Sequence, residues 1–235
     1  MGKGMVISGV VHDDTDWVRR DPAAWWQPGD HGTRPRAETI SILCGHWVAG
    51  EAGTNTYDDD GPRVVHAMKA RTDVKDVGIH FVIGACGESD AEAPIWQTAD
   101  FGIVSTVHVG KGVVNERSIG VEIVSAGLPG PADVRHRPQV ACHYLGRVVK
   151  CLAFYPGQLA TWMRLAEFLA SLDGDAGVSI KRQTPADVQH QFSIGDVRKF
   201  SGMMEHFMTP GTTKIDAGAM LIGEAQRRGW TPVGR

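Results

Sequence analysis

The sequence predicts a single α/β domain with a central β-sheet flanked by helices, and three observations support this class. Short β-branched apolar runs, typical of buried strands, alternate with segments whose apolar residues have helical spacing. Hydrophobic residues make up 42% of the 235 residues and charged residues 22%, which is ordinary for a globular protein. No repeat, low-complexity tract or linker interrupts the chain, so we expect one globular domain.

The N-terminal part of the chain differs in composition from the rest. Residues 1–37 are polar and rich in Trp, Pro and Gly, and we expect them to form an arm packed on the domain made by 38–235. That domain begins with a predicted buried strand at 38–50, whose β-branched run ends in a glycine-rich loop.

The middle of the chain supplies most of the predicted sheet. A helix with a proline at its start is expected at 62–71. The clearest strand pattern lies at 77–84, and a further buried strand is predicted at 118–127. Two segments, 93–100 and 102–110, are expected to be short strands, or one strand and one loop.

The last part of the chain contains the strongest helix pattern. Apolar residues of 156–172 lie largely on one helical face, and 217–229 is expected to be a second helix. The Pro/Gly-rich segment 126–157 has too few periodic positions for a helix, and the segment 173–200 is polar.

Charge and hydropathy exclude several classes of partner. The net charge is −3 and no block of Lys and Arg occurs, so we expect neither nucleic-acid binding nor attraction to an anionic membrane. No apolar run approaches the roughly 18 residues of a membrane span. The N-terminus lacks the apolar core of a signal peptide, so we expect the protein to be cytoplasmic as synthesised.

The cysteines are widely spaced, without a Cys-x-x-Cys pair. They are Cys44, Cys86, Cys142 and Cys151. We expect them to be small buried hydrophobic residues, and a disulfide between Cys142 and Cys151 is the alternative.

The irregular stretch before the last predicted helix carries residues that suit a metal hydrolase. His206 and Asp216 lie on either side of a Pro-Gly loop that can fold them onto one point, with Lys214 between them. His46 ends the first predicted strand, and histidine is the commonest zinc ligand. Glu122 lies within a buried strand, where an unpaired carboxylate is costly and therefore requires a partner or a shifted pKa.

Five short motifs follow one another in a fixed order between residues 38 and 228. The motifs are His-Trp-Val-Ala-Gly at 46–50, His-Phe-Val-Ile at 80–83 with Gln97 after it, Val-His-Val-Gly at 107–110, Asn115 with Ser-Ile-Gly-Val-Glu at 118–122, and His206 with Lys214 and Asp216. Their order resembles that of the zinc-dependent N-acetylmuramoyl-L-alanine amidases of the type 2 amidase and peptidoglycan-recognition-protein superfamily. Each motif is short, and their order carries the resemblance.

The resemblance implies a central mixed β-sheet flanked by helices and a set of site residues. The zinc ligands of the family fall on His46, His206 and Asp216. Glu122 takes the position of the general base, and Lys214 takes that of a cation beside the metal.

Other matched positions are expected to assist. His108 and Asn115 take positions that contact substrate, and the alternative is that they stabilise their loop through hydrogen bonds; His80 is expected to be structural. The chain departs from the family pattern at Trp47, where a second histidine is usual, and at Ala217, where proline is usual. These departures concern loop shape and substrate contacts rather than the ligands.

The implied reaction is zinc-dependent hydrolysis of the amide bond between N-acetylmuramic acid and L-alanine of peptidoglycan. The long segments 126–157 and 173–200 favour a phage endolysin that reaches the cell wall after holin-type release. The alternatives are a cytosolic recycling amidase acting on free anhydro-muropeptides and a non-catalytic peptidoglycan-binding module. A zinc peptidase is not expected, because the chain has no His-Glu-x-x-His motif. The expected partner is peptidoglycan or a muropeptide, bound by a monomer.

Overall fold

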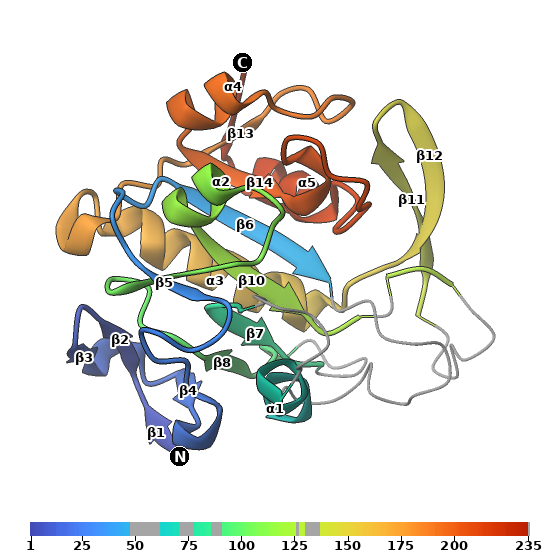
Figure 1. Ribbon diagram of the computed structural model, residues 1–235. Helices are drawn as coiled ribbons and strands as arrows, with labels where there is room; N and C mark the ends of the chain where they lie inside the picture. The colour runs from blue at the N-terminus through green and yellow to red at the C-terminus, as the bar shows by residue number, and fades with distance from the viewer. Residues whose placement is uncertain (48–61, 71–77, 86–90, 126, 130–136, 235) are drawn as a thin grey trace.

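The structure, a computed structural model, describes residues 1–47, 62–70, 78–85, 91–125, 127–129 and 137–234. It confirms the α/β class, because a seven-stranded mixed sheet forms its centre and helices lie against the sheet (Figure 1). From edge to edge, the strands of this sheet are β1 (Gly2–Lys3), β4 (Val18–Arg20), β8 (Ile95–Gln97), β7 (Phe81–Ile83), β10 (Ser118–Ile123), β6 (Ile42–Trp47) and β14 (Gly202–Glu205). The glycine-rich loop predicted at 48–50 lies outside the described residues.

Smaller elements surround the central sheet. The helices of the described residues are α1 (Pro62–Ala70), α2 (Gly112–Arg117), α3 (Pro156–Ser171), α4 (Ile194–Lys199) and α5 (Met220–Arg227), with the 3₁₀ turn η5 (His206–Met208). Paired strands outside the sheet are β2 (Met5–Ile7) with β3 (Val10–His12), β5 (Thr33–Pro35) with β9 (Val104–Thr106), β11 (Gln139–Tyr144) with β12 (Arg147–Leu152), and β13 (Gln183–Pro185) with β15 (Thr231–Val233). None of the described helices is long and apolar enough to cross a lipid bilayer.

One half of the sheet is parallel. Strands β7, β10, β6 and β14 run in the same direction, whereas β8 is antiparallel to β7 and β1 is antiparallel to β4. Parallel strands bring their carboxyl ends to the same edge of a sheet, which is where ligands bind in many α/β proteins. His46 and Glu122 lie near this edge.

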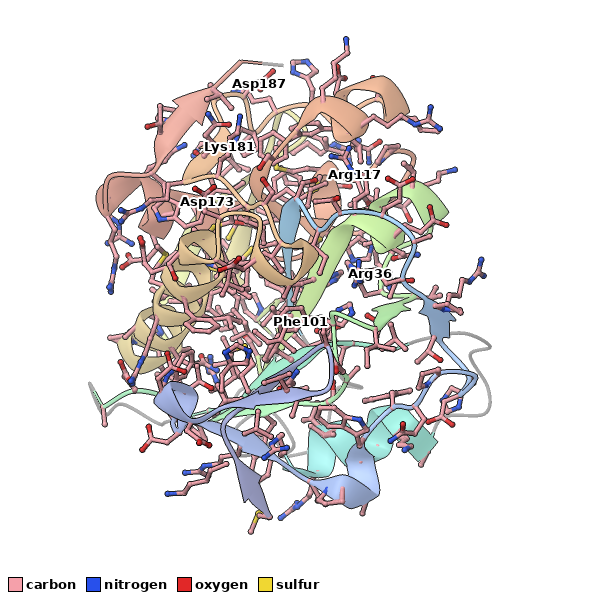
Figure 2. The ribbon with its side chains drawn as sticks, turned by 90° about the vertical axis from the view of Figure 1, so that its left-hand side faces the viewer. Arg36, Phe101, Arg117, Asp173, Lys181 and Asp187 are labelled. Carbon is pink, nitrogen blue, oxygen red and sulfur yellow. The ribbon has the colours of Figure 1, made fainter. Side chains whose placement is uncertain are left out.

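The two faces of the sheet have separate hydrophobic cores. Leu43 and Val121 pack with Trp162 of α3 on one face. Cys44 packs with Val114 of α2 on the other face. Figure 2 shows α3 on one side of the sheet and α2 on the opposite side. Because side chains alternate along a strand, neighbouring residues of β6 and β10 serve different cores.

Residues 1–37 take part in the sheet. They supply β1 and β4, which form the edge beyond β8. At the end of this segment, the half-buried Arg36, labelled in Figure 2, donates from its guanidinium to the carbonyl oxygens of Val104, Glu116 and Ser118 at 3.1, 2.6 and 3.2 Å. These bonds tie the segment to the strand that carries Glu122.

Predicted helices and strands are confirmed in most places, but the segment 126–157 holds an element that the sequence analysis does not predict. Strands β11 and β12 form a hairpin joined by Leu145 and Gly146, whose φ angles are 44° and 74°. Two-residue hairpin loops with positive φ at both positions match the twist of the strands. Residues 127–129 and 137–155, the parts of this segment that the structure describes before α3, contain no helix, as predicted. The hairpin turn is not marked in the sequence, because leucine rarely adopts a positive φ.

Three cysteines behave as small hydrophobic residues. Cys44, Cys142 and Cys151 are buried with free thiols. Cys142 and Cys151 lie on the paired strands of the hairpin and their thiols hydrogen-bond to each other. Cys86 lies outside the described residues.

Candidate active site

Strand register brings the predicted ligands together. His46 of β6 pairs with Glu122 of β10, so both side chains point to the same face of the sheet. On the other side of β6, β14 ends with Glu205 opposite Gly45. His206 follows directly and therefore lies beside His46 at the carboxyl edge of the sheet.

A backbone hydrogen bond closes the loop that carries the third predicted ligand. The N–H of Phe207 donates to the carbonyl of Asp216 at 2.9 Å. Within the loop, the N–H and the hydroxyl of Thr209 donate to the carbonyl of His206 at 2.9 and 2.8 Å. The chain is thereby folded back on itself, so side chains ten residues apart in sequence, His206 and Asp216, come into contact.

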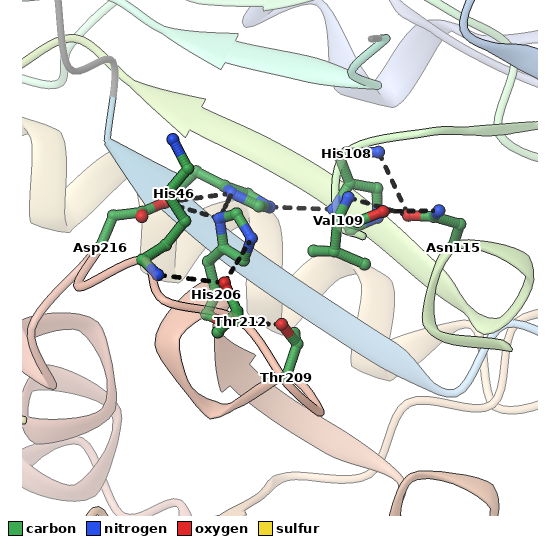
Figure 3. A network of polar contacts seen from close by, with 9 residues as sticks. His46, His108, Val109, Asn115, His206, Thr209, Thr212 and Asp216 are labelled. Carbon is green, nitrogen blue, oxygen red and sulfur yellow. Dashed lines mark hydrogen bonds and ion pairs between the residues drawn. The ribbon is translucent and has the colours of Figure 1, made fainter. Parts of the chain in front are cut away.

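Nitrogen and oxygen atoms of the three predicted ligands form a small triangle (Figure 3). Nδ1 of His46 and Nδ1 of His206 are 3.0 Å apart, and Oδ2 of Asp216 lies 3.3 and 3.0 Å from them. Ligand atoms about 2.0–2.2 Å from a tetrahedral zinc ion are roughly 3.3–3.6 Å from one another. The triangle therefore needs only a small expansion to hold the ion. All three residues are buried.

The protonation states of the triangle suit a metal. Burial disfavours the charge of Asp216, but the hydrogen bond from His206 and the neighbouring His46 outweigh burial and hold the pKa of this carboxyl well below its usual value. Burial and the neighbouring His206 lower the pKa of His46 to about 4. At neutral pH the site offers an ionised carboxylate and a neutral imidazole, which are the forms that bind zinc.

A second group of possible ligands among the described residues fits zinc less well. It consists of Cys44, His46 and His108. Burial raises the pKa of the Cys44 thiol well above its usual value, whereas zinc binds the thiolate. Nε2 of His46 and Nδ1 of His108 already form a hydrogen bond of 2.9 Å. The triangle with His206 and Asp216 is therefore the candidate zinc site.

Glu122 presents an unpaired carboxyl oxygen on the same face as the triangle. Its Oε2 atom is buried and has no hydrogen-bond partner in the part of the chain that the structure describes. Burial and the charge of Asp216 raise the pKa of Glu122 well above its usual value, while Lys214 acts in the opposite direction. Buried polar atoms are nearly always paired, so this exception points to a functional role.

Lys214 brings a positive charge to the same region. Its side chain is exposed and belongs to the loop between His206 and Asp216. Its charge lowers the pKa values of both His46 and Glu122. A cation within electrostatic range of the triangle can stabilise negative charge that develops on a substrate.

Contacts of His108 and Asn115 favour the alternative that these residues stabilise their loop. Oδ1 of Asn115 accepts from the N–H groups of His108 and Val109 at 3.1 and 3.0 Å, and its Nδ2 donates to the carbonyl of Val109 at 3.0 Å (Figure 3). The ring of His108 contacts His46 through Nδ1 at 2.9 Å and Ser118 through Nε2 at 2.7 Å. The polar side-chain atoms of both residues thus have protein partners.

The contacts of His80 suit the structural role expected of it. Its Nδ1 accepts from the N–H of Gly120 at 3.0 Å, and its Nε2 lies 3.1 Å from the carbonyl of Val104. Burial lowers the pKa of His80 well below its usual value. The other described histidines are half-buried or exposed, and they are His12, His31, His66, His143 and His190.

Two hydroxyl groups beside the ligands have no predicted role. Thr212 Oγ1 lies 3.5 Å from Nε2 of His206, and Ser118 contacts His108. The sequence does indicate the position of Ser118. This serine precedes Glu122 by four residues in the same strand, so the two side chains lie on the same face of the sheet. Thr212 lies in an irregular loop, where spacing carries no such signal.

No family model and no curated protein matches this chain. Among solved structures, the chain is similar to the N-acetylmuramoyl-L-alanine amidase LysC from Clostridium intestinale URNW, with 11% identity, a TM-score of 0.44 and coverage of 90% of this chain and 95% of that chain. It is also similar to the E. coli amidase AmiD in complex with anhydro-N-acetylmuramic acid-L-Ala-D-gamma-Glu-L-Lys, with 17% identity, a TM-score of 0.44 and coverage of 80% of this chain and 58% of that chain. The endolysin LysCS from Clostridium intestinale URNW is 11% identical with a TM-score of 0.39, and the match covers 83% of this chain and 84% of that chain.

Proposed function

We propose that this chain is a zinc-dependent amidase that hydrolyses the bond between N-acetylmuramic acid and the L-alanine of the peptidoglycan stem peptide. The observation that carries the proposal is the buried triangle of His46, His206 and Asp216 with the unpaired carboxyl of Glu122 on the same face. The order of the five sequence motifs supports the same reaction.

The donor set suits a catalytic zinc ion. Two imidazole nitrogens and one carboxylate oxygen form the triangle, and three protein ligands with one open position are typical of catalytic rather than structural zinc sites. Zinc bound to them lowers the pKa of a water molecule and polarises a carbonyl group.

Glu122 moves the proton of the reaction. Its carboxylate removes a proton from the attacking water as the oxygen adds to the lactyl carbonyl carbon. Glu122 then gives this proton to the nitrogen of L-alanine as the C–N bond breaks, which leaves a lactyl carboxylic acid and a free amine; the acid then loses its proton to the amine or to water. A carboxyl whose pKa is raised by burial is suited both to accept and to hold the proton.

Asp216 and Lys214 have different parts. The low pKa of Asp216 makes its carboxylate too weak a base to compete with Glu122, so it serves as a ligand. Lys214 carries an exposed ammonium group. Its positive charge stabilises the negative charge that develops on the carbonyl oxygen as water adds.

The proposed biological role is that of a phage endolysin acting on the cell wall after holin-type release. Two long segments that border the ligand loop support it. In the β11–β12 hairpin, the hydroxyl of Tyr144 lies 3.5 Å from the carbonyl of Thr213. In the segment 173–200, the N–H of Phe192 donates to the carbonyl of Met208 at 2.8 Å. Segments that contact the ligand loop in this way suit the binding of a stem peptide that is still attached to a glycan strand.

Mass spectrometry of purified sacculi and soluble muropeptides digested by the zinc-loaded protein tests this proposal. The expected products are stem peptides with a free L-alanine amino group and glycans with a free lactyl carboxylate. Peptides cut at any other bond, or no release at all from either substrate, would refute the proposed reaction.

A further inference from the structure

A chain of hydrogen bonds connects the ligand His46 to the backbone of helix α2. Nε2 of His46 lies 2.9 Å from Nδ1 of His108, and Nε2 of His108 lies 2.7 Å from Oγ of Ser118. Oγ of Ser118 in turn lies 2.6 Å from the carbonyl oxygen of Val114. The links between the side chains are buried, so water does not compete for them.

The last hydrogen bond of this series, from Ser118 to Val114, fixes the position of each proton in it. A carbonyl oxygen only accepts, so the single hydroxyl proton of Ser118 points to Val114. The hydroxyl oxygen must then accept from Nε2–H of His108. A neutral imidazole has one N–H, which leaves Nδ1 of His108 as an acceptor.

The same reasoning reaches the metal site. Because Nδ1 of His108 accepts, the proton between the two rings belongs to Nε2 of His46. The lone pair of His46 then lies on Nδ1, which is the atom that faces His206 and Asp216 at 3.0 and 3.3 Å. Hydrogen bonds of this kind set the tautomer of a metal-binding histidine.

We propose that His108 and Ser118 are positioning residues that hold His46 in the tautomer able to bind zinc through Nδ1. This inference rests on the proposed zinc site. It assigns a purpose to His108 in place of substrate contact, and it gives Ser118 a part in metal binding.

Packing beneath the ring of His108 supports the assignment. A Cβ atom at Gly120 would lie 2.5 Å from Cγ and 2.7 Å from Cδ2 of His108, so the ring rests directly on the backbone of β10. Ser118 and Gly120 precede Glu122 at intervals of two residues, so these three positions share one face of the strand. The strand thus provides both the space for the ring and the acceptor for its proton.

The second histidine ligand has weaker support. Nε2 of His206 lies 3.5 Å from the hydroxyl of Thr212, which is at the limit of a hydrogen bond. Nδ1 of His206 lies 3.0 Å from both Oδ2 of Asp216 and Nδ1 of His46, and both of these atoms are acceptors. His206 therefore carries a proton on Nδ1 that must leave this atom when zinc binds, whereas His46 presents its lone pair before the metal binds.

Long-range ¹H–¹⁵N spectra of the metal-free full-length protein test the tautomers without reference to activity. We expect the rings of His46 and His108 both to carry their proton on Nε2. A proton on Nδ1 of either ring would overturn the inference. In Ser118→Ala, the acceptor is lost and we expect the Nδ1–H form of His46 to appear.

Zinc affinity, measured by competition with a chelator, tests the consequence for the metal. Loss of an outer hydrogen-bond partner typically weakens metal binding about 10- to 100-fold, and we expect this for Ser118→Ala and His108→Leu. His108→Gln should restore most of the affinity, because its amide can accept from His46 and donate to Ser118. Equal affinity for His108→Leu and wild type, or no rescue by His108→Gln, would contradict the positioning role.

A matched control removes a similar contact that does not lead to the metal. The hydroxyl of Thr106 lies 3.1 Å from Nδ1 of the structural His80, so Thr106→Val should leave zinc affinity and the tautomer of His46 unchanged. If Thr106→Val weakened zinc binding as much as Ser118→Ala does, the effect of Ser118→Ala would come from general packing and the positioning role would be wrong. Failure of the proposed function has a different signature, namely zinc binding and the expected tautomers without amidase activity.

Discussion

The two ring nitrogens of His46 have different partners. Nδ1 faces His206 and Asp216, whereas Nε2 faces His108. Its position opposite Glu122 in the neighbouring strand further links the proposed metal site to the proposed base. Removal of this one side chain should therefore disturb binding of the metal more than the loss of a surface histidine.

His46→Ala should lose most of its bound zinc while it keeps its fold, because two remaining ligands hold zinc far less well than three. Metal analysis of the purified protein, with circular dichroism as the check on folding, measures this. His143→Ala on the exposed side of β11 is the control and should keep its zinc. Full zinc content in His46→Ala would rule out this ligand.

Glu122→Gln separates proton transfer from metal binding. The amide has the shape of the carboxyl but no basic oxygen, so we expect zinc and fold to be retained and the rate to fall by roughly 10²-fold or more. Turnover of a soluble muropeptide measures the change. Glu92→Gln, which alters an exposed pair with Arg164, should keep the wild-type rate. Near-normal turnover by Glu122→Gln would mean that another group is the base.

Sequence reasoning could identify the candidate ligands but not their arrangement. The order of the motifs points to His46, His206 and Asp216, and the structure brings them within hydrogen-bond distance of one another. Spacing from Glu122 predicts the face of the strand on which Ser118 lies, but not its hydrogen-bond partner, because a strand serine can bond to many neighbours. Its partner, His108, comes from a loop that the fold places over β10.

Among the secondary-structure elements, β14 is the one that brings His206 to the site. Its last residue, Glu205, lies opposite Gly45, which places His206 next to His46. The strand is only Gly202–Glu205 in length and contains two methionines, so neither alternation nor β-branched residues mark it in the sequence. The hairpin turn at Leu145 escapes prediction for a similar reason, because leucine rarely adopts a positive φ.

Helix α5 depends on β14 as well. Its N-cap residue, Ala219, provides no capping side chain. Instead the buried carboxyl of Glu205 accepts from the N–H groups of Ala219, Leu221 and Ile222 at 2.7, 2.9 and 3.0 Å. Burial nevertheless outweighs these bonds and raises the pKa of Glu205 to about 7.

This raised pKa predicts a loss of stability with rising pH. The folded protein holds the proton of Glu205 up to about pH 7, whereas the unfolded chain releases it near the ordinary value of 4.5. The stability that the buried, protonated carboxyl of Glu205 contributes is therefore fully present below about pH 4.5 and is lost as pH rises through 7, by on the order of 3 kcal/mol. Urea unfolding of wild type and Glu205→Gln between pH 5 and 8, both in chelator, measures the difference.

The neutral amide of Glu205→Gln should remove this part of the pH dependence. The control is Glu224→Gln in α5, where the wild-type carboxyl pairs with Arg228 at 2.7 Å. This variant should retain the pH dependence that comes from Glu205. Parallel curves for wild type and Glu205→Gln over this range would show that the carboxyl of Glu205 does not titrate as described.

The chain as a whole offers no general attraction to an anionic polymer. Its net charge is −3, so binding to a cell wall must come from local contacts near the site. The β11–β12 hairpin and the segment 173–200 both contact the loop that joins His206 to Asp216, and they are the parts of the chain suited to make such contacts.

We therefore expect the protein to release peptides from intact sacculi at rates comparable to those on soluble fragments. Parallel time courses on the two substrates, with equal concentrations of stem peptide, measure the ratio. Activity confined to soluble anhydro-muropeptides would replace the endolysin role with that of a recycling amidase, while leaving the proposed chemistry intact.

Anomalous X-ray diffraction at the zinc edge, from crystals of the zinc-loaded protein, shows directly where the metal binds. The proposed zinc site requires one peak about 2.0–2.2 Å from Nδ1 of His46, Nδ1 of His206 and Oδ2 of Asp216. A peak bound instead by Cys44 and His108, or no peak at the triangle in protein that retains zinc, would contradict it.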